Sequence, residues 1–155
     1  EMLMRAIRIT IPKFNAEEVE GHFYTVEELK LINNIAGVYS NLGQNKTAVD
    51  MYYQLLKYMK KNFCNLEQIV GIYILANYNY SRLLCLEKIP KQSLEIAEEG
   101  RKACIQYGRS DCLAGLLVVQ ADCLHQLGKD TESKERFLQS YHVYSALDDK
   151  KMQKQ

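Results

Sequence analysis

The 155-residue sequence lacks both the charge excess of a nucleic-acid-binding domain and the long apolar run of a membrane span. Lys and Arg number 20 against 19 Asp and Glu, and the net charge is +1, so no domain-wide positive field exists to hold a phosphate backbone. No apolar stretch reaches the length of a bilayer-spanning helix, and no basic segment followed by an apolar run opens the chain. We therefore expect a cytoplasmic domain that contacts neither nucleic acid nor membrane directly.

The residue patterns of metal, cofactor and catalytic sites are also missing. The five cysteines include no CxxC pair, and no histidine stands at zinc-finger spacing from them. No glycine-rich phosphate loop is present, and the three histidines have no neighbours at the spacing of a nucleophilic site. Asp122 precedes His125 by three residues, which predicts a pair on a helix surface. We expect no enzyme, no cofactor, no metal, and five reduced cysteines packed as small hydrophobes.

What the sequence does contain is a helix-hairpin pattern at residues 29–56, around which the rest of the chain is organised. Small and large apolar residues recur there at steps of three and four on both sides of a Leu-Gly pair: Ile32, Ala36, Tyr39, Leu42, Gly43, Ala48, Tyr52 and Leu55. This order resembles the tetratricopeptide repeat. The resemblance implies an all-α fold, a tetratricopeptide-like right-handed superhelix of antiparallel helix hairpins.

Capping signals give the bounds of the first hairpin. Thr25 and Glu28 form a capping box that predicts a helix over residues 26–41, and Gly43 is suited to the left-handed turn that ends it. A second helix is expected at residues 46–62. Upstream, residues 1–10 form a helix that must end near Ile11, because Pro12 disfavours helical geometry in the residue before it.

Further signals predict the second and third hairpins. Asn65 with Gln68 makes another capping box, Pro90 suits a first helical turn, and Ser110 or Asp111 caps the next helix. The whole chain is then a single array with hairpins at residues 25–62, 66–107 and 110–147 and a tail at 148–155. We expect residues 1–11 to end a truncated repeat with more protein before it, a simple N-terminal helix being the alternative. A short helix is expected at residues 16–20.

Stacked hairpins of this kind curve and present a concave surface lined by the first helix of each pair. The aligned small residues Ala36, Ser81 and Ala121 lie 45 and 40 residues apart, against about 34 in the usual repeat, which predicts long helices. Side chains predicted to line this groove are Asn33, Gly37, Ser40, Asn77, Tyr78, Arg82, Asp122, His125 and Gln126. Asn amides can clamp a peptide backbone, Tyr adds flat contact area, and Arg pairs with carboxylates. The alternative for each residue is a solvated helix face.

Three passages carry a wider resemblance: RAIRITIPKF, EELKLINNIAGVYSNLGQNKTAVDMYYQLLKYMKKN, and SLEIAEEGRKACIQYGR followed by ADCLHQLGK. They resemble the C-terminal part of Gram-positive, Xre-type helix-turn-helix transcriptional regulators, some of which sense short signalling peptides. The resemblance implies a regulatory domain that binds a short peptide or protein segment and forms a homodimer, with the DNA-binding domain outside these residues. It also implies that Asn33 and Asn77 are groove asparagines and that Arg82 pairs with a peptide carboxylate. A protein-binding adaptor and an oligomeric scaffold unrelated to transcription remain alternatives.

Overall fold

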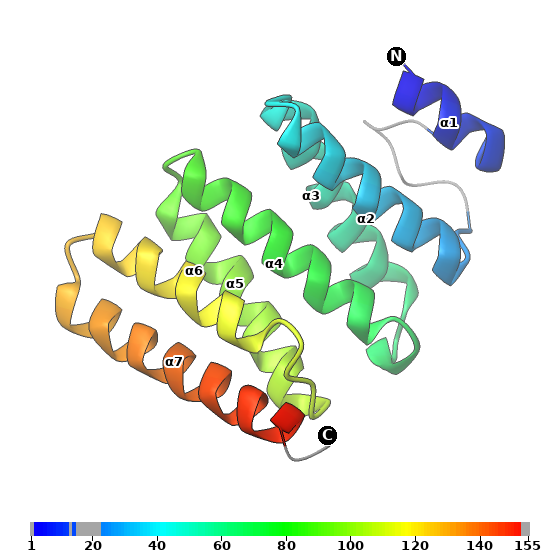
Figure 1. Ribbon diagram of the computed structural model, residues 1–155. Coiled ribbons are helices and arrows are strands. Elements are labelled where there is room, and N and C mark those ends of the chain that lie inside the picture. The colour runs from blue at the N-terminus through cyan, green and yellow to red at the C-terminus, as the bar shows by residue number, and fades with distance from the viewer. Residues whose placement is uncertain (1, 13, 15–22, 153–155) are drawn as a thin grey trace. The chain divides into compact units, whose positions relative to one another are not determined.

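The computed structural model describes residues 2–12, 14 and 23–152, and every regular element in these ranges is a helix (Figure 1). The elements are α1 (Met2–Thr10), α2 (Val26–Asn41), α3 (Asn45–Asn62), the 3-10 turn η1 (Leu66–Gln68), α4 (Val70–Leu86), α5 (Pro90–Gln106), α6 (Leu113–Gln126) and α7 (Asp130–Met152). The predicted all-α fold is confirmed. None of the helices described is long and apolar enough to cross a bilayer. The short helix expected at residues 16–20 lies outside the described residues.

The chain forms two compact units, residues 1–76 and 77–155, which we call the N-terminal and C-terminal units. In the N-terminal unit α2 packs along α3, and α1 contacts α2. The predicted capping box is confirmed, because Thr25 Oγ1 accepts from the Glu28 backbone N–H at 3.3 Å while the Glu28 carboxylate accepts from Thr25 N–H at 2.7 Å. Ala36 of α2 and Ala48 of α3 are fully buried, as the repeat pattern predicts for its small residues.

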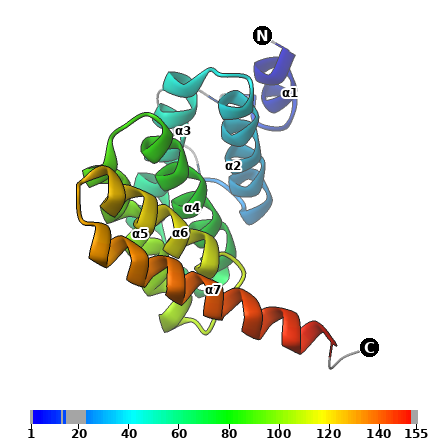
Figure 2. The same cartoon turned by 60° about the vertical axis from the view of Figure 1, so that its left-hand side comes forward.

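In the C-terminal unit α6 packs against both α5 and α7 (Figure 2). Two buried serines tie the helix pairs together: Ser93 Oγ donates to the Ser81 carbonyl at 2.6 Å, and Ser133 Oγ donates to the Ala121 carbonyl at 2.8 Å. Both bonds span 12 residues, the same interval that separates Ala36 from Ala48 in the first hairpin. Residues 148–152, predicted as part of a tail, instead continue α7.

Three turns with one geometry establish the repeat register. Gly43, Lys88 and Gly128 have φ of 73°, 63° and 74°, and each follows its aligned small residue, Ala36, Ser81 or Ala121, by seven positions. The next residue in each turn donates its N–H to the carbonyl five positions earlier, at 2.9 to 3.0 Å. Lys88 therefore occupies the position that glycine holds in the other two turns, although the sequence LEKIP contains no Leu-Gly pair.

The left-handed conformation of Lys88 gives a prediction about stability. A side chain with a Cβ pays roughly 1 kcal/mol to adopt this conformation, and glycine does not. We expect Lys88→Gly to raise the free energy of unfolding by about 0.5 to 1 kcal/mol, measured by urea denaturation. The opposite change at an equivalent turn, Gly43→Lys, should lower it by a similar amount, and equal stabilities for all three proteins would contradict the register.

Two predicted helix caps are wrong. Asn65 Oδ1 accepts from the Glu67 N–H at 2.9 Å and so begins the 3-10 turn η1, whereas α4 begins later, at Val70. Ahead of α6 the capping residue is Cys112, which makes no side-chain capping bond. The Asp111 carboxylate is held instead by the Arg109 guanidinium, whose Nε lies 2.9 Å away. In both places a local polar contact competes with the expected cap.

A charged cluster links α5 to α6. Glu98 accepts from Arg101 Nε and Nη2, both at 2.7 Å, and from the Gln120 amide nitrogen at 2.8 Å. These hydrogen bonds, led by those from Arg101, lower the pKa of Glu98 from 4.5 to about 2. A lowered carboxyl pKa stabilises the fold above pH 4.5, and this contribution is lost as the pH falls toward 2.

This cluster predicts an acid-dependent stability difference. The pKa shift corresponds to about 3 kcal/mol, which partial exposure of the side chains reduces to about 2 kcal/mol. We expect Glu98→Gln to be less stable than wild type by about that amount at pH 6, with the difference disappearing near pH 2. Urea denaturation across this pH range checks the prediction. A difference that does not depend on pH would mean that the Glu98 charge is not the cause.

Candidate functional site

The register of the turns defines which residues of α2, α4 and α6 are equivalent. Three positions before the aligned small residue stand Asn33, Tyr78 and Val118, and one position after it stand Gly37, Arg82 and Asp122. Four positions before it stand Ile32, Asn77 and Leu117, which are 0%, 0% and 4% exposed. Asn77 therefore occupies a core-packing position.

Contacts of Asn77 agree with this assignment. A Cβ built on Gly100 of α5 would lie 2.9 Å from the Asn77 Cβ, so the two helix backbones approach closely there. The structure places the Asn77 side chain at the contact between α4 and α5 and not on an open face of α4. Tyr78 is the residue of α4 equivalent to Asn33.

Tyr78 lies over α6. Its ring is half-buried, and a Cβ built on Gly115 would lie 2.7 Å from Tyr78 Cε2. Gln126, at the other end of α6, donates its amide N–H to the Cys85 carbonyl at 3.2 Å. Since residues 78 and 85 of α4 meet residues 115 and 126 of α6 in the same order, the two helices run parallel in this unit. Gln126, predicted as a ligand contact, thus helps hold α6 against α4.

The ring contact predicts the effect of a side chain at residue 115. Gly115→Ala should displace the Tyr78 ring, because the added methyl group would overlap it, while the exposed rim of α4 leaves the ring free to turn away. We expect a stability change below about 1.5 kcal/mol and a clear change in tyrosine near-UV circular dichroism. An unchanged spectrum would contradict the contact.

Arg82 and Asp122 occupy equivalent positions on α4 and α6, and both side chains are exposed. Arg82 makes no hydrogen bond or ion pair with any residue that the structure describes. It follows Tyr78 by four residues, one helical turn, so the ring and the guanidinium lie on one face of α4. The face offers a flat aromatic contact beside an unpaired five-donor cation.

A pocket of about 410 Å³ adjoins this face where α6 meets the start of α7. Its lining residues are Asp122, His125, Asp130, Ser133, Lys134 and Phe137. His125 Nδ1 lies 2.8 Å from Asp130 Oδ1, so the pair predicted between His125 and Asp122 is wrong. The partner lies beyond the Gly128 turn, which brings the start of α7 back toward the end of α6. The lining of this pocket combines charged side chains of both signs with the aromatic ring of Phe137. It therefore suits a ligand that has a polar backbone and an apolar side group.

The other predicted residues belong to the N-terminal unit. Asn33 is 2% exposed; its amide nitrogen donates to Asn34 Oδ1 at 3.5 Å, and its oxygen finds no hydrogen-bond donor among the described residues. Gly37 is half-buried, and a Cβ there would lie 3.3 Å from the Tyr52 hydroxyl of α3. Ser40 is also half-buried, and its carbonyl accepts from the Gly43 N–H at 3.0 Å. At 2% exposure the Asn33 side chain, like that of Asn77, lies in the core rather than on an open helix face.

Two buried cysteines are poor nucleophiles at neutral pH. Burial raises the pKa of Cys85 to about 12 and that of Cys104 to about 11, so both stay protonated at neutral pH. Cys64 is exposed, contrary to the expectation that all five cysteines pack in the core. Within the described part of the chain, no three His, Cys, Asp or Glu side chains converge as a metal ion would require.

Sequence reasoning missed Gly115 and the α7 residues of the site. Gly115 is six residues before Ala121, a spacing that carries no repeat signal, and its role depends on Tyr78 from another helix. Lys134 and Phe137 lie on α7, the second helix of its hairpin. The predicted groove contains only the first helix of each pair, so it excludes these two residues. Only the close approach of α7 to the end of α6 adds them.

The RNPP family C-terminal domain matches residues 6–155 of this chain. The chain belongs to the RNPP family. A comparison with curated proteins finds no match for this RNPP domain.

Solved structures resemble the RNPP domain in fold. Bacillus thuringiensis PlcR, in a crystal structure with the peptide PapR7 and DNA, matches with a TM-score of 0.75 at 17% identity over 98% of this chain and 51% of that one. A putative kinesin light chain of Podospora anserina with nearly identical TPR-like repeats matches with a TM-score of 0.67 at 15% identity, over 95% of this chain and 66% of that one. Both confirm the tetratricopeptide-like fold. The RNPP domain spans about half the length of the PlcR chain.

Proposed function

We propose that this RNPP domain is the peptide-binding regulatory domain of a bacterial transcriptional regulator. Its membership of the RNPP family over residues 6–155 is the observation that carries the proposal. The PlcR structure with which it shares a fold contains a peptide and DNA. We assign peptide binding to this domain, and DNA contact to a domain outside these residues. Such a regulator acts in the cytoplasm, and the role assigned to this domain is binding rather than catalysis.

The proposed peptide site in the C-terminal unit consists of Tyr78, Arg82, Asp122 and His125 with the adjoining pocket. The exposed guanidinium suits the carboxylate of a peptide end, and the Tyr78 ring suits an apolar side chain next to it. Asp122 occupies the position on α6 that is equivalent to Arg82 on α4. Its carboxylate suits a backbone amide or a basic group of the ligand. Opposite charges along one face favour a ligand held in a single direction.

Affinity selection with a synthetic library of random short peptides with free carboxyl termini tests this function. Purified chain 1–155 is incubated with the library, and mass spectrometry identifies the peptides it retains. We expect wild type to enrich related sequences and the Tyr78→Ala, Arg82→Gln double variant to lose them. Lys91→Gln, an exposed cation on α5, is the matched charge control and should retain the same peptides. Equal enrichment by wild type and the double variant would contradict the proposal.

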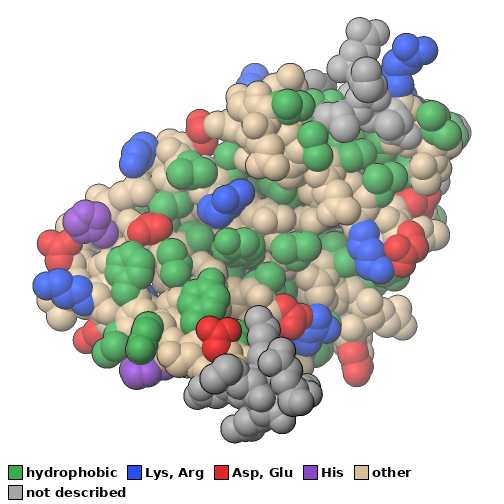
Figure 3. Space-filling model, viewed as in Figure 1, with side chains coloured by type: hydrophobic (Ala, Val, Ile, Leu, Met, Phe, Trp, Pro, Cys, Tyr) green, Lys and Arg blue, Asp and Glu red, His purple; other side chains and the backbone are tan. Residues whose placement is uncertain are grey.

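Self-association is the second part of the proposed function. The large apolar side chains exposed on α7 are Phe137, Leu138, Tyr141 and Tyr144, each at least 42% exposed, and hydrophobic side chains gather over this helix in Figure 3. Clusters of this kind on a protein surface favour an interface, and we assign it to a second copy of the chain. Analytical ultracentrifugation should detect dimers of wild type and weaker association of Leu138→Glu. A strict monomer at high concentration would contradict the dimer.

A further inference from the structure

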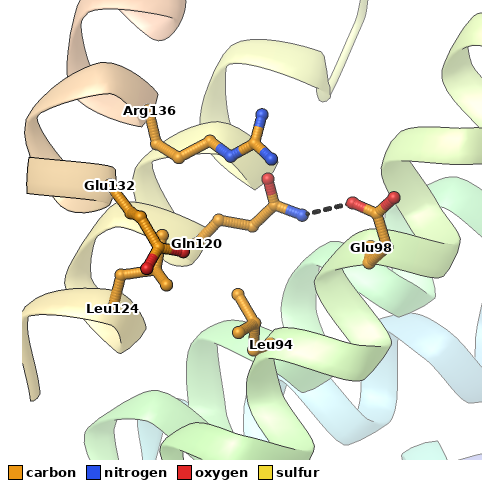
Figure 4. A pocket seen from close by; sticks show the side chains of 6 residues that line it. All are labelled: Leu94, Glu98, Gln120, Leu124, Glu132 and Arg136. Carbon is orange, nitrogen blue, oxygen red and sulfur yellow. Dashed lines mark hydrogen bonds between the residues drawn. The ribbon is translucent and has the colours of Figure 1, made fainter. Parts of the chain in front are cut away.

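A second cavity in the C-terminal unit lies away from the proposed peptide site. Its volume is about 210 Å³, and its lining residues are Leu94 and Glu98 of α5, Gln120 and Leu124 of α6, and Glu132 and Arg136 of α7 (Figure 4). Gln120 and Leu124 are each two residues from Asp122, about 200° around the helix, so they point away from the face that carries Asp122. The cavity and the peptide site therefore lie on opposite sides of α6.

Gln120 gives this cavity an unsatisfied polar atom. The side chain is 1% exposed, its amide nitrogen donates to Glu98 at 2.8 Å, and its oxygen has no donor among the described residues. Rotating the amide by 180° does not help, because it would set the oxygen against the Glu98 carboxylate. A buried amide oxygen without a donor costs about 1 to 3 kcal/mol. The site therefore favours an occupant with an N–H or O–H group.

Arg136 supplies hydrogen-bond donors to the same cavity. Its guanidinium is half-buried and donates from Nη1 to Gln139 at 2.8 Å, while its other nitrogens have no partner within the described ranges. In Figure 4 the Gln120 oxygen is turned to the side on which Arg136 lies. A carboxylate there would accept from the guanidinium fork. Glu132, paired with Lys129 at 3.3 Å and exposed on the rim, adds a negative charge that suits an ammonium group.

Arg136 is the charge of the lining that needs a counter-ion. Glu98 is paired with Arg101, and Glu132 is paired with Lys129 on the rim, so a carboxylate on the ligand would neutralise the Arg136 guanidinium. Leu94 and Leu124 form the apolar part of the lining. A molecule of liquid water occupies roughly 30 Å³, so the cavity has room for a ligand with the volume of several water molecules.

We propose that this cavity binds a free α-amino acid with an apolar side chain. The carboxylate pairs with Arg136, the ammonium group donates to the Gln120 oxygen and faces Glu132, and the side chain contacts Leu94 and Leu124. This ligand would bridge α5, α6 and α7. The site is separate from the peptide face.

Titration of the chain 1–155 with leucine tests the proposal, monitored by isothermal calorimetry and by amide chemical shifts. We expect leucine to bind with a Kd of about 1 mM or lower, as suits a ligand of this size. Leucinamide lacks the carboxylate and N-acetyl-leucine lacks the ammonium group, and each should bind at least about tenfold more weakly. These probes use only wild-type protein, so the result does not depend on whether a variant folds.

Substitutions then test which residues of the chain bind leucine. Arg136→Gln and Gln120→Met should each weaken leucine at least about tenfold, while Lys91→Gln leaves it unchanged. Arg82→Gln should also leave leucine binding unchanged although it weakens peptide binding, so the two sites can fail independently. No leucine or valine binding at about 20 mM would overturn the proposal and mean that the cavity holds water only. Equal binding of the blocked forms would also overturn it, because the carboxylate and the ammonium group would then not be recognised.

Discussion

Gly100→Val, at a buried position of α5, is expected to lower the free energy of unfolding by about 3 kcal/mol or more, the largest stability loss that we predict for a single substitution. A Cβ at this position would lie 2.9 Å from the Asn77 Cβ and 3.0 Å from Leu116 Cδ2. The Asn77 Cβ is attached directly to the α4 backbone and cannot rotate away. Relief of the overlap therefore requires α4 and α5 to separate, which breaks packing along both helices.

A melting curve measures this effect, with an expected fall in Tm of about 6 to 12 °C. Gly100→Ala should lose less, about 1 to 2 kcal/mol, because better helix propensity offsets part of the overlap. Glu95→Val introduces the same side chain at an exposed position of α5 and should cost about 0.5 kcal/mol. A Gly100→Val protein as stable as Glu95→Val would contradict the close approach of α4 and α5.

Arg82→Gln is expected to weaken binding of a selected peptide on the order of 10- to 100-fold, provided that the peptide has a free carboxyl terminus. Removing the guanidinium leaves the carboxylate without its charged donor, and glutamine offers at most a neutral hydrogen bond. Fluorescence anisotropy with an N-terminally labelled peptide gives the two dissociation constants. Near-identical circular dichroism and Tm should show that the exposed substitution leaves the fold intact.

Amidation of the peptide gives the matched chemical test of this contact. In wild type the amidated peptide should bind about as weakly as the free peptide binds Arg82→Gln, and amidation should change little in the variant. Such a cycle isolates the interaction between the two groups from their separate effects. If amidation weakens binding equally in wild type and in Arg82→Gln, the carboxylate is bound by another residue. Lys91→Gln should retain the wild-type difference.

Local signals in the sequence were sufficient where the structure uses local contacts. The Thr25–Glu28 capping box and the Gly43 turn involve residues a few positions apart, and the predicted bounds of α2 agree with the structure. Aligning Ser81 with Ala36 also succeeded, because the buried hydroxyl of Ser93 requires a small residue opposite it. Periodicity and turn chemistry therefore predicted the hairpins themselves.

The site was harder to predict because its residues depend on other helices. The resemblance to peptide-sensing regulators pairs Asn77 with Asn33. No Leu-Gly pair in the sequence indicates the left-handed turn at Lys88, and the register of that turn makes Tyr78 the residue equivalent to Asn33. The sequence predicts Gln126 as a ligand contact, whereas its amide donates to the Cys85 carbonyl, 41 residues away, a contact that no local pattern indicates. Nothing near Gln120 in the sequence indicates that Glu98 fixes its amide from α5.

Photo-crosslinking of a selected peptide to the chain 1–155 tests the central claim most directly, with a diazirine placed near the peptide's carboxyl terminus and the modified residues located by mass spectrometry. The account predicts crosslinks on the face that carries Tyr78, Arg82 and Asp122, reduced by excess unlabelled peptide. Competed crosslinks confined to the solvent-exposed side of α5, around Lys91 and Glu95, would contradict it.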